Sequence, residues 1–181
     1  VMRDLAGANE STFVTVPFLS GGIADPEPLG PTSAVLGTIG PDGSRGTADD
    51  LLVRLDALDT ASPQATSVAV GGLSGFEASR PVALSSRDVI VFTEGPDGTR
   101  GTADDTIVLV SDLGGASESV TPITVGGLVS YPSSRPVMLG RTSALVCTEG
   151  PDGNIGTPDD TVVLLRELGS DNRVVPIEVG G

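Results

Sequence analysis

Apolar residues occur along this chain in short stretches, separated by segments rich in glycine, proline and aspartate. In two of these stretches, TIVLV (106–110) and TVVLL (161–165), both alternating faces are apolar. Strands that read this way are buried on both sides. With 25 glycines and 14 prolines, the chain has far more turn residues than a helical protein tolerates. The pattern therefore predicts an all-β fold of short strands, with TIVLV and TVVLL covered on both faces.

The apolar stretches belong to a repeat whose period is 55 residues, the spacing of Asp42, Asp97 and Asp152. Each unit has an apolar stretch, an aspartate-rich loop, a second apolar stretch, a polar turn and a short strand that ends in a glycine pair. At the scale of strands this gives four β-segments per unit, of which the first is short. Residues 23–31 (IADPEPLGP) are expected to be an extended linker between units.

The unit size is that of a β-propeller blade, so we expect a propeller built from four-stranded antiparallel blades. Residues 2–22 align with the end of the last unit, which makes the N-terminal segment a partial blade with only third and fourth strands. The expected division is a partial blade at 1–22 and blades at 23–72, 73–127 and 128–181. About three and a half blades cannot close a ring, so we expect either a longer precursor, consistent with Val1 in place of methionine, or completion by another chain.

The loops carry the candidate chemistry: GPDGSRGTADD (40–50), GPDGTRGTADD (95–105) and GPDGNIGTPDD (150–160). Counting from the first aspartate, each loop offers an oxygen-bearing side chain at positions 1, 3, 6, 8 and 9. The candidate metal ligands are therefore Asp42, Ser44, Thr47, Asp49 and Asp50 in the first loop, Asp97, Thr99, Thr102, Asp104 and Asp105 in the second, and Asp152, Asn154, Thr157, Asp159 and Asp160 in the third.

Hard cations such as Ca²⁺ take six to eight oxygen ligands, and short glycine-containing loops supply them at alternate positions. The chain has no histidine, which disfavours zinc and copper. The alternative is an ordinary hairpin turn with solvated aspartates, since Asp and Gly dominate turns. Neighbouring residues of a strand point to opposite sides, so one aspartate of each final pair is expected to contact the metal.

The repeat resembles the blades of bacterial extracellular β-propellers in which a calcium loop joins the second and third strands, a design similar to the FG-GAP blades of integrin α-subunits. The resemblance implies calcium bound for stability outside the cell, where millimolar calcium saturates weak sites. The protein would then be extracellular or at the cell surface, with Ca²⁺ as its only cofactor.

Composition narrows the function further. The net charge of −14 argues against nucleic acid or an anionic membrane as a partner. The single cysteine, Cys147, lies in the apolar run SALVC and is expected to be a small buried residue. Arg80 and Arg135, at equivalent places before a proline, are expected to pair with acidic residues of neighbouring blades.

No nucleophile with a base is evident, and paired carboxylates occur only in the repeated loops, so we expect no enzymatic activity. The favoured function is structural: a secreted scaffold, an adhesin segment or a subunit of an extracellular filament. Its partner would be another copy of the chain, through exchange of strands between subunits, or the remainder of the propeller. The alternative is a fragment of a propeller-type carbohydrate-active enzyme or lectin.

Overall fold

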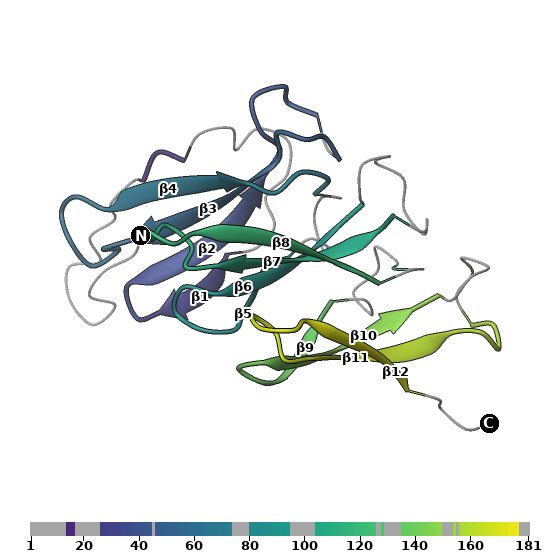
Figure 1. The fold of residues 1–181 in the computed structure, drawn as a ribbon. Helices are drawn as coiled ribbons and strands as arrows, with labels where there is room; N and C mark the ends of the chain where they lie inside the picture. Colours follow the sequence, from purple (N-terminus) through teal and green to yellow (C-terminus); the bar gives the residue numbers. More distant parts are fainter. Residues whose placement is uncertain are drawn as a thin grey trace.

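The computed structural model describes residues 14–16, 26–44, 46–73, 80–94, 104–125, 128, 135–149, 154 and 156–177. These residues form strands and turns, with no helix among them (Figure 1). None of the described residues therefore forms a helix that could span a membrane. The strands are β1 (Glu27–Gly30), β2 (Ser33–Thr38), β3 (Leu51–Asp56), β4 (Gln64–Ala69), β5 (Val82–Ala83), β6 (Val89–Thr93), β7 (Thr106–Ser111), β8 (Ser119–Thr124), β9 (Val137–Gly140), β10 (Ser143–Thr148), β11 (Thr161–Arg166) and β12 (Arg173–Ile177).

The strands form three separate antiparallel sheets, each of four strands in sequence order: sheet 1 (β1–β4), sheet 2 (β5–β8) and sheet 3 (β9–β12). The expectation of an all-β chain with four antiparallel β-segments per repeat is confirmed. The expected linker at 23–31 is wrong in part, because residues 27–30 form β1. Leu29 in this strand is buried and packs with Val35 of β2, so a single inward side chain fixes the segment to the sheet.

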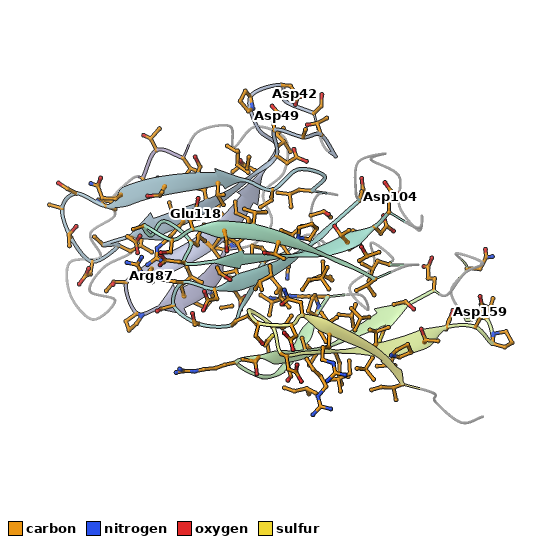
Figure 2. All side chains as sticks on the ribbon, in the orientation of Figure 1. Asp42, Asp49, Arg87, Asp104, Glu118 and Asp159 are labelled. Carbon is orange, nitrogen blue, oxygen red and sulfur yellow. The ribbon has the colours of Figure 1, made fainter. Side chains whose placement is uncertain are left out.

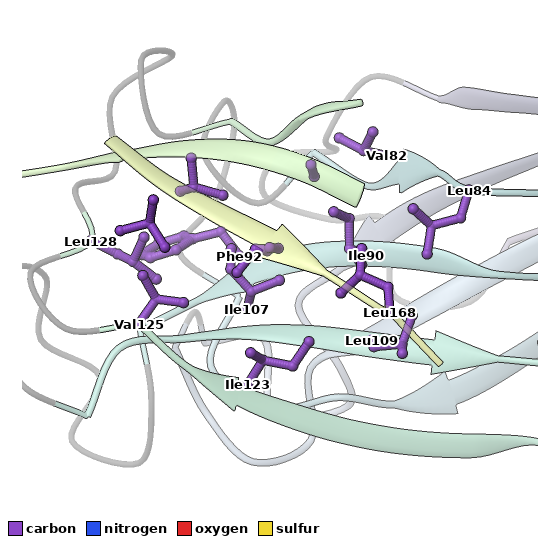
Figure 3. Close-up of a cluster of buried hydrophobic side chains, with 14 residues drawn as sticks. Val82, Leu84, Ile90, Phe92, Ile107, Leu109, Ile123, Val125, Leu128 and Leu168 are labelled. Atoms are coloured by element: carbon purple, nitrogen blue, oxygen red, sulfur yellow. The ribbon is translucent and has the colours of Figure 1, made fainter. Parts of the chain in front are cut away.

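Sheet 2 lies between the other two sheets and is buried on both faces (Figure 1). On one face, Val89 and Val91 of β6 pack against sheet 1. On the opposite face, Ile90 and Phe92 pack against sheet 3, in the cluster of buried side chains shown in Figure 3. The double-sided burial that the sequence predicts for TIVLV (106–110) is confirmed, because its four apolar residues are at most 4% exposed.

The same expectation for TVVLL in β11 is wrong. Val163 and Leu165 are buried against sheet 2, whereas Val162 and Leu164 on the other face are only half-buried. Cys147 of β10, expected to be buried, is exposed on that same face. In sheets 1 and 2 the corresponding face is covered by the next sheet, and within the described residues nothing covers it in sheet 3.

The turns between third and fourth strands begin with the same backbone conformation in all three units. Ala57, Asp112 and Glu167 stand 55 residues apart, and each has a positive φ, of 54°, 50° and 57°. A left-handed backbone is uncommon for residues other than glycine. The left-handed residue recurs at three equivalent positions, which indicates that units similar in sequence also share this backbone conformation.

A buried arginine joins sheet 1 to sheet 2. Arg54 of β3 donates from Nη1 to the backbone oxygens of Ser86 (2.9 Å) and Leu113 (3.0 Å), in two turns that connect the strands of sheet 2. Its Nε and Nη2 bond the carboxylate of Asp56 at 2.6 and 2.8 Å. The guanidinium is thus satisfied on both edges, which a planar five-donor group allows.

A second ion pair links the first and third units. Arg135, two residues before β9, donates from Nη2 to Oε2 of Glu27 in β1 at 3.0 Å. The sequence predicts a pairing of Arg135 with an acidic residue of a neighbouring blade, whereas its partner Glu27 belongs to the first unit, two units away. β1 also contacts β5. The first strands of the units therefore lie on a common side of the stack, next to one another.

Candidate metal loops and the junctions behind them

The structure describes the three aspartate loops to different extents. The first loop is described except for residue 45, the second only at Asp104 and Asp105, and the third at Asn154 and 156–160. Four of the expected ligands, Asp97, Thr99, Thr102 and Asp152, lie outside the described residues. The first loop therefore gives the most complete geometry of the motif.

The first loop closes on itself through its own aspartates. The backbone N–H of Asp42 donates to Asp49 Oδ2 at 3.0 Å, and the N–H of Ser44 donates to Asp42 Oδ1 at 2.7 Å. Gly40 starts the turn with φ of 66°, and a Cβ there would collide with the backbone carbonyl of Asp49. Figure 2 shows Asp42 and Asp49 on this one loop, beyond the end of sheet 1. The closure holds two carboxylates near each other at an exposed tip.

Thr47 provides the polar centre of this loop. Its Oγ1 lies 2.7 Å from Asp49 Oδ1 and 3.4 Å from the backbone oxygen of Ser44. The hydroxyl bond from Thr47, followed by the N–H of Asp42, lowers the pKa of Asp49 below its usual range. Asp49 is therefore held in its anionic form at neutral pH.

The third loop reproduces this arrangement. Thr157 Oγ1 lies 2.6 Å from Asp159 Oδ1 and 3.1 Å from the backbone oxygen of Asn154. The N–H of Asp160 donates to the backbone oxygen of Thr157 at 3.2 Å. In the first loop, the N–H of Asp50 donates to the backbone oxygen of Thr47 at 3.3 Å. The threonine at position 6 therefore shares these three contacts in both loops, and Thr157 Oγ1 also lies 3.3 Å from Asp160 Oδ1.

The last aspartate of the first loop has a different environment from its neighbour. Asp50 is fully buried, and its Oδ2 accepts the N–H of Thr47 (3.1 Å) and the N–H of Leu73 (2.8 Å). Its Oδ1 is buried without a hydrogen-bond partner. Burial is the main reason that the pKa of Asp50 is raised from 3.8 to about 6, against the opposing effect of the two N–H donors.

Asp50 also connects the loop to the end of β4 through its backbone. Its carbonyl accepts the N–H groups of Val70 (2.9 Å) and Gly71 (3.2 Å). Gly71 and Gly72 have φ of 65° and 66°, a pair of left-handed residues that lets the chain turn here. The repeated glycine pair is thus explained by the contact it makes with the loop.

Two further backbone bonds complete this junction. The N–H of Gly72 donates to the carbonyl of Thr47 at 2.8 Å, and the N–H of Gly46 donates to the carbonyl of Leu73 at 3.1 Å. Gly72 in turn accepts the N–H of Glu94, at the end of β6, at 2.6 Å. The segment GTADD (46–50) therefore binds VGGL (70–73), where the chain passes from unit 1 to unit 2.

The last aspartate of the loop differs in burial among the three copies. Asp105 is fully buried, as Asp50 is. Asp160 is partly exposed, and its Oδ2 accepts the N–H of Gly156 within its own loop at 2.7 Å. Sequence reasoning missed the junction, although GTxDD and VGG recur together in every unit, which is the signal that could have revealed it.

Nowhere in the described part of the chain do three or more acidic, histidine or cysteine side chains gather to hold a metal ion. The first loop offers two carboxylates, Asp42 and Asp49, with the oxygens of Ser44 and Thr47 beside them. Each ionised carboxylate has about four acceptor sites, so one hydrogen bond to an oxygen does not prevent a cation from binding it. The residues therefore fit a hard cation only with backbone oxygens or water as further ligands.

A groove lies beside the first loop, between sheets 1 and 2. Its volume is about 850 Å³, and it is lined by loop residues such as Thr47 and by β8 residues such as Val120 and Pro122. Among the described residues of its lining, Asp104 is the only acidic one and none is basic. This described part of the lining has no carboxylate pair of the kind that hydrolyses glycosidic bonds.

No protein-family model, curated protein or solved structure matches the chain. What the loops do is therefore inferred from their geometry and from the way the units pack.

Proposed function

We propose that this protein is a non-enzymatic, calcium-binding repeat protein with a structural role in an extracellular assembly. Each unit would be one blade of a β-propeller, and each aspartate loop would hold one Ca²⁺. The observation that carries the proposal is that the neighbouring carboxylates of Asp49 and Asp50 have different surroundings. The first carboxylate stays in the exposed loop, and the second is built into the junction between units.

In this proposal the ligands come from positions 1, 3, 6 and 8 of each loop. In the first loop these are Asp42, Ser44, Thr47 and Asp49, completed by backbone oxygens and water. Two carboxylates held close together repel each other, and a bound cation removes this repulsion while using oxygens that calcium prefers. Position 9, Asp50 in this loop, is withdrawn from the ligand set because its Oδ2 already accepts two backbone N–H groups.

Thr47 would couple the bound ion to the fold. Its hydroxyl contacts Asp49 in the loop, while its N–H donates to Asp50 and its carbonyl accepts from Gly72 in the junction. Ordering the loop around a cation would therefore also order the contact between successive units. This explains why a structural protein would keep the motif in every unit, where a catalytic site would be needed only once.

Propeller architecture is supported by the order of packing. Three four-stranded meanders stack in sequence order, and the first strands β1 and β5 are in contact. The Glu27–Arg135 pair joins the first strands of units 1 and 3. In a propeller the first strands surround the central axis, which would bring them together in this way.

The proposal is tested by unfolding the protein in urea with calcium and with EGTA. Calcium should raise the unfolding midpoint of the wild type. Asp49→Asn should lose a part of this increase, because it removes a ligand of the first loop.

Asp50→Asn is the matched control, one residue away in the same motif. It should keep the full response to calcium, because position 9 is not a ligand. A wild type with the same midpoint in calcium and EGTA would overturn the calcium function. An Asp50→Asn variant that loses the response while Asp49→Asn keeps it would overturn the assignment of ligands.

A further inference from the structure

The exposed apolar side chains of this protein are concentrated on its last sheet. Six large hydrophobic residues are exposed among the described residues, and all except Val120 lie in β9 or β12 of sheet 3: Val137, Leu139, Val174, Val175 and Ile177. Five residues of this kind on one sheet are unlike the scattered apolar residues of an ordinary surface, and such a patch marks an interaction site.

The strand register places Val137, Val175 and Ile177 on the outer face of sheet 3, whereas Val174, which pairs with Leu165, lies on the inner face. Leu145 pairs with Leu164 and Val137, and Leu164 pairs with Val175. The next row of the same face holds Cys147, Val162 and Ile177. Because side chains opposite each other in a sheet share a face, these residues form one continuous aliphatic surface across β9 to β12.

The outer face of sheet 3 corresponds to a face that is an interface in the preceding unit. Val82 and Leu84 of sheet 2, the counterparts of Val137 and Leu139, are 6% and 9% exposed because sheet 3 covers them. In sheet 3 the same positions are 61% and 58% exposed. The outer face of sheet 3 therefore has the apolar residues of an interface, although no described residue covers it.

The faces that cover such a surface inside the chain are themselves occupied. The covering face of sheet 1, formed by Leu36, Val53 and Leu55, is buried beneath Val14 and Val16. The corresponding faces of sheets 2 and 3 are buried in the stack. Among the sheet faces that the structure describes, the outer face of sheet 3 of a second copy is therefore the one that remains free to cover that of the first.

The charges on this face make it complementary to itself. Along β11 the outward positions are Val162, Leu164 and Arg166, and Asp160 directly precedes the strand, so the row runs from an acidic end through an apolar centre to a basic end. Arg173 pairs with Arg166 in the register, but its Nη1 lies 3.6 Å from Oε1 of Glu167, so Arg166 provides the positive charge at the basic end. A two-fold axis in the plane of the interface and perpendicular to the strands would place the acidic end of one copy against the basic end of the other.

We propose that two copies of this chain associate through the outer faces of sheet 3, related by that two-fold axis. This rests on the proposed function in one respect only, that the protein works by assembly, and it does not require calcium. A four-stranded face of this size lies at the small end of specific interfaces, so the dimer is weak and depends on concentration.

The test is sedimentation velocity of the full chain, between about 5 and 200 μM, where weak interfaces associate. The wild-type mass should approach twice the chain mass of 18.1 kDa as concentration rises. Val137→Asp with Leu139→Asp should raise the dissociation constant at least about 100-fold, because a carboxylate would be buried in each half of the interface. Val120→Asp, at an exposed apolar residue outside this face, should leave the dimer unchanged.

Cys147 gives a second readout that does not depend on a variant. Since it lies within the proposed interface, a short bis-maleimide should link two wild-type chains through this thiol, with a yield that rises with concentration. Circular dichroism checks that the double variant folds.

Monomers throughout the concentration range would overturn the proposal. So would a dimer that survives the double substitution, or a mass that grows beyond the dimer without limit. If the protein binds no calcium and still forms the dimer in EGTA, the proposed dimer stands and the proposed calcium function is wrong.

Discussion

Asp50→Asn exchanges a buried carboxylate for an amide of nearly the same shape, and its effect should depend on pH. The amide oxygen can still accept the N–H groups of Thr47 and Leu73, so the junction is kept. What the variant removes is the charge, and with it the cost of holding that charge away from water. At neutral pH the variant should therefore be more stable than the wild type.

The magnitude follows from the pKa of Asp50, which burial raises from 3.8 to about 6. The folded protein then binds this proton more tightly than the unfolded chain does. The contribution of Asp50 to stability is therefore fully present below its ordinary pKa and is lost as the pH rises through about 6. A shift of about two units corresponds to about 3 kcal/mol, which is the upper limit of the loss at neutral pH.

The assay is urea unfolding of both proteins in EGTA, followed by circular dichroism from about pH 4 to pH 7. The free energy of unfolding of the variant minus that of the wild type should rise by about 2 kcal/mol over this range. Asp49→Asn is the control with the opposite sign, because the pKa of Asp49 is lowered and its charge favours the folded state. Parallel pH profiles for wild type and Asp50→Asn would refute the buried position of this carboxylate.

Three further results are expected. Arg54→Ala should lower the free energy of unfolding by about 3 kcal/mol because it leaves the buried carbonyl of Leu113, the carbonyl of Ser86 and the carboxylate of Asp56 without their donor. Arg87→Ala, which breaks an exposed ion pair, should cost under about 1 kcal/mol in the same urea assay. Gly40→Ala should destabilise the protein more than Gly43→Ala in thermal unfolding: both have positive φ, but only at Gly40 does a Cβ meet backbone atoms. Equal effects would contradict the closed geometry of the loop. Calcium at about 100 times its dissociation constant should add about 2.7 kcal/mol of stability per site, and EGTA should reverse this in calorimetry.

The strands were predictable because their cause is local. Alternating and continuous apolar runs, repeated three times, define all the strands from β2 onward. β1 was missed because EPLG has prolines in and around it and only one inward side chain, Leu29. The exposure of Val162, Leu164 and Cys147 could not be predicted, because it depends on whether another sheet covers them and not on their own pattern.

The candidate site divides in the same way. The oxygen-bearing positions of each loop are visible in the sequence, and Asp42, Ser44, Thr47 and Asp49 are in mutual contact in the first loop. The role of Asp50 was hidden because its partner Leu73 lies 23 residues away in the next unit. Such contacts follow from the packing of units, which periodicity alone does not describe.

The most direct test of the account is an isothermal titration of the wild-type chain with CaCl₂ after treatment with EGTA and dialysis. One ion per loop predicts about three sites in the chain, since the motif occurs three times. Variants at Asp49 and at Asp159, its counterpart in the third loop, should each remove one site. The absence of any binding heat at several temperatures, together with an unchanged unfolding midpoint in calcium, would contradict the account and leave the loops as ordinary turns.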